Sequence, residues 1–484
     1  MSNALPPNPS QFRDTQQWAQ QLYQFMVAES RIKVDNDPVP ILLPHQTDGV
    51  MERAGQAGVL MYDPVLKAVV YSEDDVWYPL SKGQGMEQLD AFGRLRVSNP
   101  ETIFDSQLQY DTQPLLWVEK LVSGGTVTHL PDESAADLTV PTTSGASVIR
   151  QTREFFRYQP GKSQQIFCTG VLGELQANTN KLVGYGETKN GVFFGQDGGG
   201  TYVLLRSNST GSISDARKVY QADWDTDALD GNGASRKTAD WTKAQIFTID
   251  LEWLGVGQVR MGVVIEGQLI TVHTFKNANT QVTTYMTTAN LPARYEITNT
   301  AVTAAPATLK QICTQVTTEG GVSNLQSFPF SRGANTVAIP NGAANAQMLF
   351  AQRHKLTFNG IENRGRFSPL RYEVNATGGT VYSEVHYVPI LDGTETWTSD
   401  GPFSIMESSQ DVGQGFTNGF VIESAAAAAG GGRATGNSES RGLSNRLPFG
   451  LDIDGANAVV IGVTFYALTN NVTADISFHW EEVR

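Results

Sequence analysis

The chain has 484 residues, of which 40% are hydrophobic and 17% charged, and its formal net charge is −14. These proportions exclude a chain that is disordered throughout. The acidic balance argues against a nucleic-acid-binding surface, because phosphate contact needs a basic face. The 47 glycines and few charges favour short strands joined by tight turns, so we expect a mainly β fold.

The N-terminus reads MSNALPPNPSQ and lacks a charged region followed by an apolar core, so no signal peptide is predicted. No window of about 18 uninterrupted apolar residues occurs, and no membrane span is predicted. We therefore expect synthesis in a cytoplasm.

Residues 12–32 carry the spacing of an amphipathic helix, with Trp18, Leu22, Phe25 and Met26 on one face. An isolated helix of this length is marginal in water, so its apolar stripe needs a partner. That partner is either another chain or the body of the same chain.

Residues 57–80 alternate in the manner of short strands and predict a small β-hairpin or three-strand unit. A unit with so few apolar residues is barely stable alone, so we expect it to associate. Its candidate contact residues are Leu60, Tyr62, Tyr71 and Trp77. Together with the helix it forms an N-terminal attachment and oligomerisation arm, residues 1–87.

The segment DAFGRLRVSNPETIFDSQLQYD, residues 90–111, is an irregular joint between this arm and two antiparallel β-sandwich domains, of jelly-roll or lectin-like type, at 88–320 and 321–484. The clearest hairpin spans residues 251–275 and turns at Glu266-Gly267. Asn-Gly pairs are strong hairpin signals, and they occur at Asn190, Asn232, Asn341, Asn359 and Asn418. The alanine- and glycine-rich residues 424–442 predict a mobile surface loop.

The acidic run DWDTDALDGNG is the best candidate for a metal site, because Asp223, Asp225 and Asp227 have the alternate spacing that calcium loops use. Ala228 and Ala234 stand where an EF-hand needs glycine and glutamate, which excludes that motif. A non-standard calcium site and a solvated acidic turn both remain open.

Other catalytic patterns are missing from the sequence. It has no GxSxG elbow, no P-loop and no HExxH, and a glycosidase would need two facing carboxylates that nothing singles out. The two cysteines, Cys168 and Cys313, belong to no CxxC pair, so two buried free thiols are favoured over a single disulfide. Histidines such as His354 and His386 lie in predicted strands and favour structural roles. We expect no enzyme activity, no cofactor and no metal.

The joint, the acidic run and QIFTIDLEWLGVGQVRMGVVIEGQLITVHTF resemble virion structural proteins of tailed bacteriophages, often those of marine hosts. LPARYEI at 291–297 fits the same pattern, and FGLDIDG and HWEEVR look similar to the ends of such proteins. The resemblance covers residues 88–484. The 57–80 unit is similar to fibre hairpins that stack as symmetric trimers, although the run from Met61 to Pro64 departs from their register.

The resemblance implies a virion structural component of the tail, tail fibre or baseplate that forms a homo-oligomer, with a trimer expected, through its N-terminal arm. Its partners would be copies of itself, other virion proteins and host-surface glycan, with neither nucleic acid nor membrane insertion. One alternative is a capsid decoration or head-fibre protein. An alternative of another class is a protein that binds or depolymerises host polysaccharide.

Overall fold

The computed structural model describes strands β1 (Leu60–Asp63), β2 (Ala68–Glu73) and β3 (Val76–Pro79). It also describes residues 89–94, 96, 98–321, 327–387, 390–391, 395–410, 416–417, 419–429, 434–436 and 448–484. β1, β2 and β3 form an antiparallel three-stranded sheet in that order, where the sequence predicted a hairpin or three-strand unit. The helix expected over residues 12–32 lies outside the described residues.

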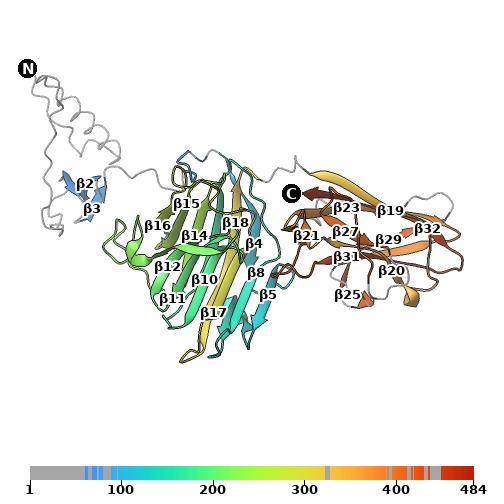
Figure 1. The fold of residues 1–484 in the computed structure, drawn as a ribbon, viewed down its shortest axis with the longest axis horizontal. Coiled ribbons are helices and arrows are strands. Elements are labelled where there is room, and N and C mark those ends of the chain that lie inside the picture. Colours follow the sequence, from blue (N-terminus) through green and yellow to red (C-terminus); the bar gives the residue numbers. More distant parts are fainter. Residues whose placement is uncertain are drawn as a thin grey trace, which may run out of the picture.

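The strands between residues 100 and 319 form two antiparallel sheets (Figure 1). The seven-stranded sheet has the order β13 (Ser214–Tyr220), β12 (Gly200–Ser207), β11 (Gly191–Asp197), β10 (Thr179–Gly186), β17 (Ala293–Asn299), β8 (Ser147–Thr152), β5 (Trp117–Val122). The short 3₁₀ helix η3 (Pro131–Glu133) lies between the paired strands β6 and β7, and η4 (Gln221–Asp223) follows β13.

The eight-stranded sheet has the order β16 (Gln268–Phe275), β15 (Val259–Ile265), β14 (Gln245–Leu251), β9 (Gln164–Val171), β18 (Ala307–Glu319), β7 (Ala135–Val140), β6 (Thr126–Leu130). β4 (Pro100–Gln107) also pairs with β18. It pairs with residues 313–319 of that strand, whereas β7 pairs with residues 307–311. The turn at Glu266-Gly267 joins β15 to β16 as predicted, and both residues have the positive φ that such a turn requires.

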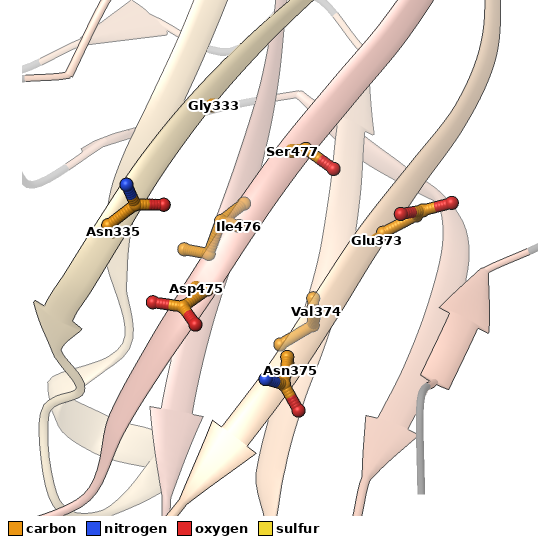
Figure 2. A pocket seen from close by; sticks show the side chains of 8 residues that line it. All are labelled: Gly333, Asn335, Glu373, Val374, Asn375, Asp475, Ile476 and Ser477. Atoms are coloured by element: carbon orange, nitrogen blue, oxygen red, sulfur yellow. The ribbon is translucent and has the colours of Figure 1, made fainter.

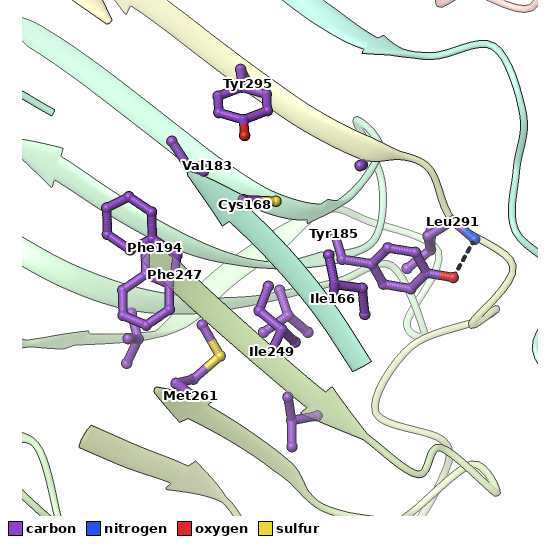
Figure 3. Close-up of a cluster of buried hydrophobic side chains, with 14 of the residues drawn as sticks. Ile166, Cys168, Val183, Tyr185, Phe194, Phe247, Ile249, Met261, Leu291 and Tyr295 are labelled. Carbon is purple, nitrogen blue, oxygen red and sulfur yellow. Dashed lines mark hydrogen bonds between the residues drawn. The ribbon is translucent and has the colours of Figure 1, made fainter. Parts of the chain in front are cut away.

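The two sheets enclose one apolar core, so this part of the chain is a β-sandwich (Figure 3). Alternate residues of each strand point inward: Val183 and Tyr185 come from the seven-stranded sheet, and Ile249 and Leu251 from the eight-stranded one. This period of two also fixes which residues face outward.

The hydroxyl of Tyr185 makes several hydrogen bonds inside this core. Its hydroxyl donates to the Ala289 carbonyl at 2.9 Å and accepts from the Leu291 amide at 3.3 Å, the contact drawn in Figure 3. Burial raises the pKa of this phenol well above its usual range. The side chain therefore holds the segment before β17 onto β10.

We predict that Tyr185→Phe lowers the free energy of unfolding by about 1–3 kcal/mol, because it leaves a buried amide and carbonyl without their partner. Urea unfolding measures the loss. Tyr382→Phe is the control, since Tyr382 is half-buried and stacks on Tyr466 at 5.0 Å between ring centroids. An equal loss in both variants would contradict the role given to Tyr185.

The strands from residue 328 onward form a second body. Its four-stranded sheet has the order β19 (Phe328–Ala338), β32 (Thr473–Val483), β23 (Arg366–Thr377), β30 (Ala434–Gly436). Its six-stranded sheet has the order β26 (Thr398–Ser399), β27 (Met406–Ser409), β20 (Gln347–His354), β31 (Val460–Ala467), β24 (Val381–Tyr387), β29 (Phe420–Ala427). The remaining elements are η5 (Ala343–Asn345) and the pairs β21 (Thr357–Phe358) with β22 (Ile361–Glu362) and β25 (Ile390–Leu391) with β28 (Phe416–Thr417).

These two sheets share a second apolar core that includes Trp480 and Phe465. The loop predicted over residues 424–442 is wrong in part, because β29 continues to Ala427 and β30 occupies residues 434–436. Ala427 is buried and Ala425 packs against the core, so small side chains here fit between the strands.

Contacts between the two bodies include two ion pairs and one contact between a guanidinium and an aromatic ring. Lys120 lies 2.6 Å from Asp454, and Lys189 lies 2.8 Å from Glu362. The Arg364 guanidinium lies 4.3 Å from the centroid of the Phe155 ring. Exposed ion pairs of this kind each contribute about 0–1 kcal/mol, so the contact depends weakly on any one of them.

Candidate functional site

The joint predicted between arm and body is anchored by ion pairs on the outer face of the eight-stranded sheet. Asp250 faces outward from β14, because its neighbours Ile249 and Leu251 belong to the core. Arg96 reaches Asp250 at 2.7 Å and Glu319 at 2.9 Å. Arg260, opposite Asp250 on β15, also pairs with it.

Arg94 makes the second half of this anchor. It lies 2.5 Å from Asp90 and 2.5 Å from Glu252, and both carboxylates are almost fully buried. Asp90 Oδ1 also accepts hydrogen bonds from the backbone amides of Phe92 and Arg94. The turn at residues 90–94 is therefore fixed by its own aspartate.

The backbone of the segment is bound as well. The Leu89 carbonyl accepts from Arg96 Nε at 3.1 Å and from Arg260 Nη2 at 2.7 Å, and the Ala91 carbonyl accepts from Gln258. The start of the described body is thus held to β14, β15 and the loop between them.

This anchor contains four carboxyl groups and three guanidinium groups. The carboxyls are Asp90, Asp250, Glu252 and Glu319, and the guanidiniums are Arg94, Arg96 and Arg260. Burial raises the pKa of Glu252 and of Glu319, and the nearby Asp90 adds to both shifts. Removing Arg94 would leave Asp90 and Glu252 without a cationic partner, and removing Arg96 would leave Glu319 without one, whereas Asp250 is shared between Arg96 and Arg260.

We predict that Arg96→Met destabilises the protein by about 3–5 kcal/mol, because Glu319 loses its guanidinium partner and Asp250 keeps only Arg260. Urea unfolding measures the effect. In the control Lys243→Met, the lost contact is an exposed pair with Asp240 at 3.3 Å, and a change of about 0–1 kcal/mol is expected. If Arg96→Met lowers the free energy of unfolding no more than the control does, the ion pairs of Arg96 do not stabilise the protein.

The acidic run at 223–233 has carboxylates that serve separate backbone partners. Asp227 is buried and accepts from the amides of Leu229 and Ser235. Asp225 accepts from the amide of Thr274, on β16. Among the described residues, no group of three His, Cys, Asp or Glu side chains could hold a metal ion.

Cys168 and Cys313 are both unbridged, as predicted, but the burial predicted for both thiols is wrong for Cys313. Cys168 is buried in the core, and burial raises the pKa of its thiol to about 12. Cys313 is half-buried and faces outward from β18.

His354 is fully buried in the second body, where its Nε2–H donates to the Gly365 carbonyl at 3.0 Å. Burial lowers its pKa from 6.5 to about 4. The unfolded chain therefore takes up the proton first as the pH falls.

We predict that His354 contributes stability that is complete above pH 6.5 and is lost as the pH falls toward 4, by roughly 3 kcal/mol in all. In His354→Gln, the difference in unfolding free energy between pH 7 and pH 4.5 should shrink. Urea unfolding at the two pH values measures it. An unchanged pH dependence in the variant would contradict the buried neutral imidazole.

The predicted contact residues of the arm divide into two groups. Trp18, Leu22, Phe25 and Met26 lie outside the described residues. The other four lie in the three-stranded unit, where Leu60 pairs with Tyr71 across β1 and β2, Tyr62 is in β1 and Trp77 is in β3.

Two open grooves lie on outer sheet faces. The first, of about 430 Å³, crosses β4, β18, β9 and β14, and we call it the Phe167 groove; its lining residues include Asp105, Gln107, Phe167, Ile246, Cys313 and Gln315. The second, of about 460 Å³, crosses β19, β32 and β23, and we call it the Asn375 groove (Figure 2); its lining residues include Asn335, Glu373, Asn375, Asp475 and Ser477.

Neither groove was predicted from the sequence. Alternation within each strand indicates which residues face outward, and the strands around Phe167 and Asn375 show that alternation. Which outward residues become neighbours depends on how the strands pair. β18 and β9, for example, pair although their residues lie more than 100 positions apart.

No family model matches the chain, and no curated protein matches it. Among solved structures, the chain is similar to a protein of unknown function from Shewanella oneidensis MR-1, with 7% identity over 52% of this chain and 100% of the other and a TM-score of 0.32. It is similar to the CBM2 module of the evolved Dit of Lactobacillus casei BL23 phage J-1, with 8% identity, coverages of 47% and 99% and a TM-score of 0.30.

A legume lectin-like domain from Entamoeba histolytica is also similar, with 8% identity, coverages of 44% and 96% and a TM-score of 0.27. With TM-scores this low, none of these similarities carries a functional conclusion. The chain's own geometry has to do so. No helix of the described residues is long and apolar enough to cross a membrane.

Proposed function

We propose that the chain is a structural component of a tailed-phage virion, in the tail, tail fibre or baseplate. In this proposal residues 1–87 attach and oligomerise the protein, the bodies at 88–320 and 321–484 are its outer domains, and a sheet face contacts carbohydrate. The resemblance of residues 88–484 to virion proteins supports the assignment, and the same architecture would serve a capsid decoration or head-fibre protein.

The observation that carries the proposal is the anchor of Arg94 and Arg96. A passive linker between a tail and a body needs no buried charges, whereas this segment is held by several ion pairs and by bonds to its backbone. Such a joint fixes the position of the chain at residues 89–94, where the body begins. A fixed position matters for a part that must transmit force between a particle and a surface.

One pair of carboxylates in the structure could be considered for the alternative function of a polysaccharide-degrading enzyme. Asp250 and Glu252 stand two residues apart at the end of β14, and two carboxylates are the usual machinery of glycoside cleavage. Both are buried, and each is bound by an arginine of the joint. This arrangement favours a structural role for the pair, and we propose a binding protein without catalysis.

We predict that the full chain forms a trimer through the arm, so light scattering should give three times the 52.6 kDa of one chain. The double variant Trp18→Asp, Phe25→Asp should be a monomer, because charge on the apolar stripe opposes its burial between copies. Gln20→Asp, Gln24→Asp places the same charges on the opposite side of the expected helix and should stay trimeric.

A wild-type chain that is monomeric at micromolar concentration would contradict the proposed assembly. So would a double variant on the apolar stripe that keeps the wild-type mass. Equal loss in both double variants would show that added charge, and not the stripe, controls the mass.

A further inference from the structure

We infer that the Phe167 groove binds a neutral oligosaccharide. This inference rests on the proposed function, in which a sheet face contacts carbohydrate, and it assigns that contact to one face and one class of sugar.

The register puts four outward side chains in one row across the sheet. Asp105 on β4 pairs with Gln315 on β18, Gln315 pairs with Phe167 on β9, and Phe167 pairs with Thr248 on β14. The flanking residues Ile166 and Cys168 belong to the core, which confirms that Phe167 faces outward. The aromatic ring of Phe167 therefore lies next to the amide of Gln315, with the carboxylate of Asp105 beyond it, and the buried Thr248 lies on the other side of the ring.

These groups match the two kinds of surface that a sugar ring presents. The half-buried Phe167 ring can pack against the apolar C–H face of a pyranose. Gln315 offers both a donor and an acceptor to the hydroxyls, and Asp105 and Gln107 add further acceptors. A few polar groups around an apolar floor is the usual composition of a small-molecule site, and about 430 Å³ lies within the usual range of volumes.

The side chain of Gln315 is held in place by a hydrogen bond before any ligand binds. The Gln315 amide donates from Nε2 to Thr102 Oγ1 at 3.0 Å, which fixes the side chain and points the carbonyl oxygen of the amide away from Thr102. A side chain that is fixed before binding loses less conformational entropy when a ligand arrives.

The charge of the groove selects a neutral sugar. Asp105 is the single charged residue among those that line it, and the chain as a whole carries −14. An acidic polysaccharide would meet this carboxylate without a cation in the lining to balance it. Neutral hydroxyls can instead donate to Asp105.

The groove suits a sugar better than a protein partner. The core of a protein interface is depleted in charged groups and rich in large apolar ones. Here the amide of Gln315 and the carboxylate of Asp105 occupy the same row as the one aromatic ring, and Ile246 is 38% exposed beside them. The Asn375 groove has two carboxylates and no aromatic residue in its lining, so it lacks the apolar platform and serves as a control.

The test is isothermal titration calorimetry of the full chain with maltohexaose, cellohexaose, xylohexaose and mannohexaose, and with hexagalacturonic acid as the acidic probe. At least one neutral hexasaccharide should bind, and the acidic one should bind at least tenfold more weakly. Phe167→Ala and Gln315→Ala should each weaken the neutral interaction at least tenfold. Asn375→Ala, in the other groove, should leave it within twofold of wild type.

Cys313 gives a second readout that needs no loss-of-binding variant. It lines the Phe167 groove and is half-buried, whereas Cys168 is in the core, so a maleimide should modify Cys313 first. A bound neutral hexasaccharide should slow this modification, in proportion to occupancy. The variant Cys313→Ser should lose the fast modification and identify the thiol.

Several outcomes would overturn the inference. They are no binding of any neutral hexasaccharide, preference for the acidic probe, unchanged affinity in both groove variants, or a Cys313 that stays unreactive in the folded chain because the arm or a second copy covers the face. A trimer that binds no sugar overturns this inference alone, whereas a monomer that binds sugar overturns the assembly and leaves the groove assignment standing.

Discussion

The structure depends on a small set of ion pairs, with largely buried carboxylates, that hold residues 89–94 and Arg96 against the outer face of a β-sheet. Burying a charge is costly unless it is paired, so Glu252 needs Arg94 and Glu319 needs Arg96, while Asp250 is shared by Arg96 and Arg260. Three of the five pairs join residues more than 150 positions apart: Arg94 with Glu252, and Arg96 with Asp250 and Glu319. They decide where the chain enters the first sandwich and which part of the sheet face it covers.

The face that the joint leaves uncovered is the one with the Phe167 groove. Asp250 and Gln165 pair across β14 and β9, in the row next to that of Phe167 and Thr248. Anchoring and contact would therefore share one sheet surface, with ion pairs at one end and a mixed aromatic and amide groove beside them. Both rows run through β9 and β14, which lie in the middle of the sheet.

The sequence was informative where structure is local. Glu266-Gly267 and Asn359-Gly360 both have the paired positive φ of tight hairpins and join β15 to β16 and β21 to β22. The same Asn-Gly signal does not form a hairpin at Asn232, where Gly233 lies so close to the Asp227 carboxylate that a Cβ would come within 2.2 Å of it. At this position the lack of a side chain on Gly233 allows the backbone to pass close to the Asp227 carboxylate.

The sites were less predictable, because they arise from pairings between distant strands. The spacing of Asp250 and Glu252 could have been taken from the sequence as two carboxylates on one side of a strand, but nothing local assigns Arg94 and Arg96 to them. The irregularity predicted over residues 90–111 holds at 90–94, where the Asp90 side chain binds the amides of Phe92 and Arg94. It is wrong for residues 100–107, which form the strand β4 because they pair with β18. The alanine run at 425–429 shows the reverse case, where composition suggested a loop and core packing made the first part a strand.

Hydrogen exchange of the backbone amides of residues 90, 92 and 94, followed by mass spectrometry on the full chain, tests the anchor most directly. These amides donate to Arg94 O and to Asp90 Oδ1, so the account predicts that they exchange as slowly as those of β14 and β15. Complete exchange of this segment within seconds, while the two strands stay protected, would show that the joint is loose and would contradict the account.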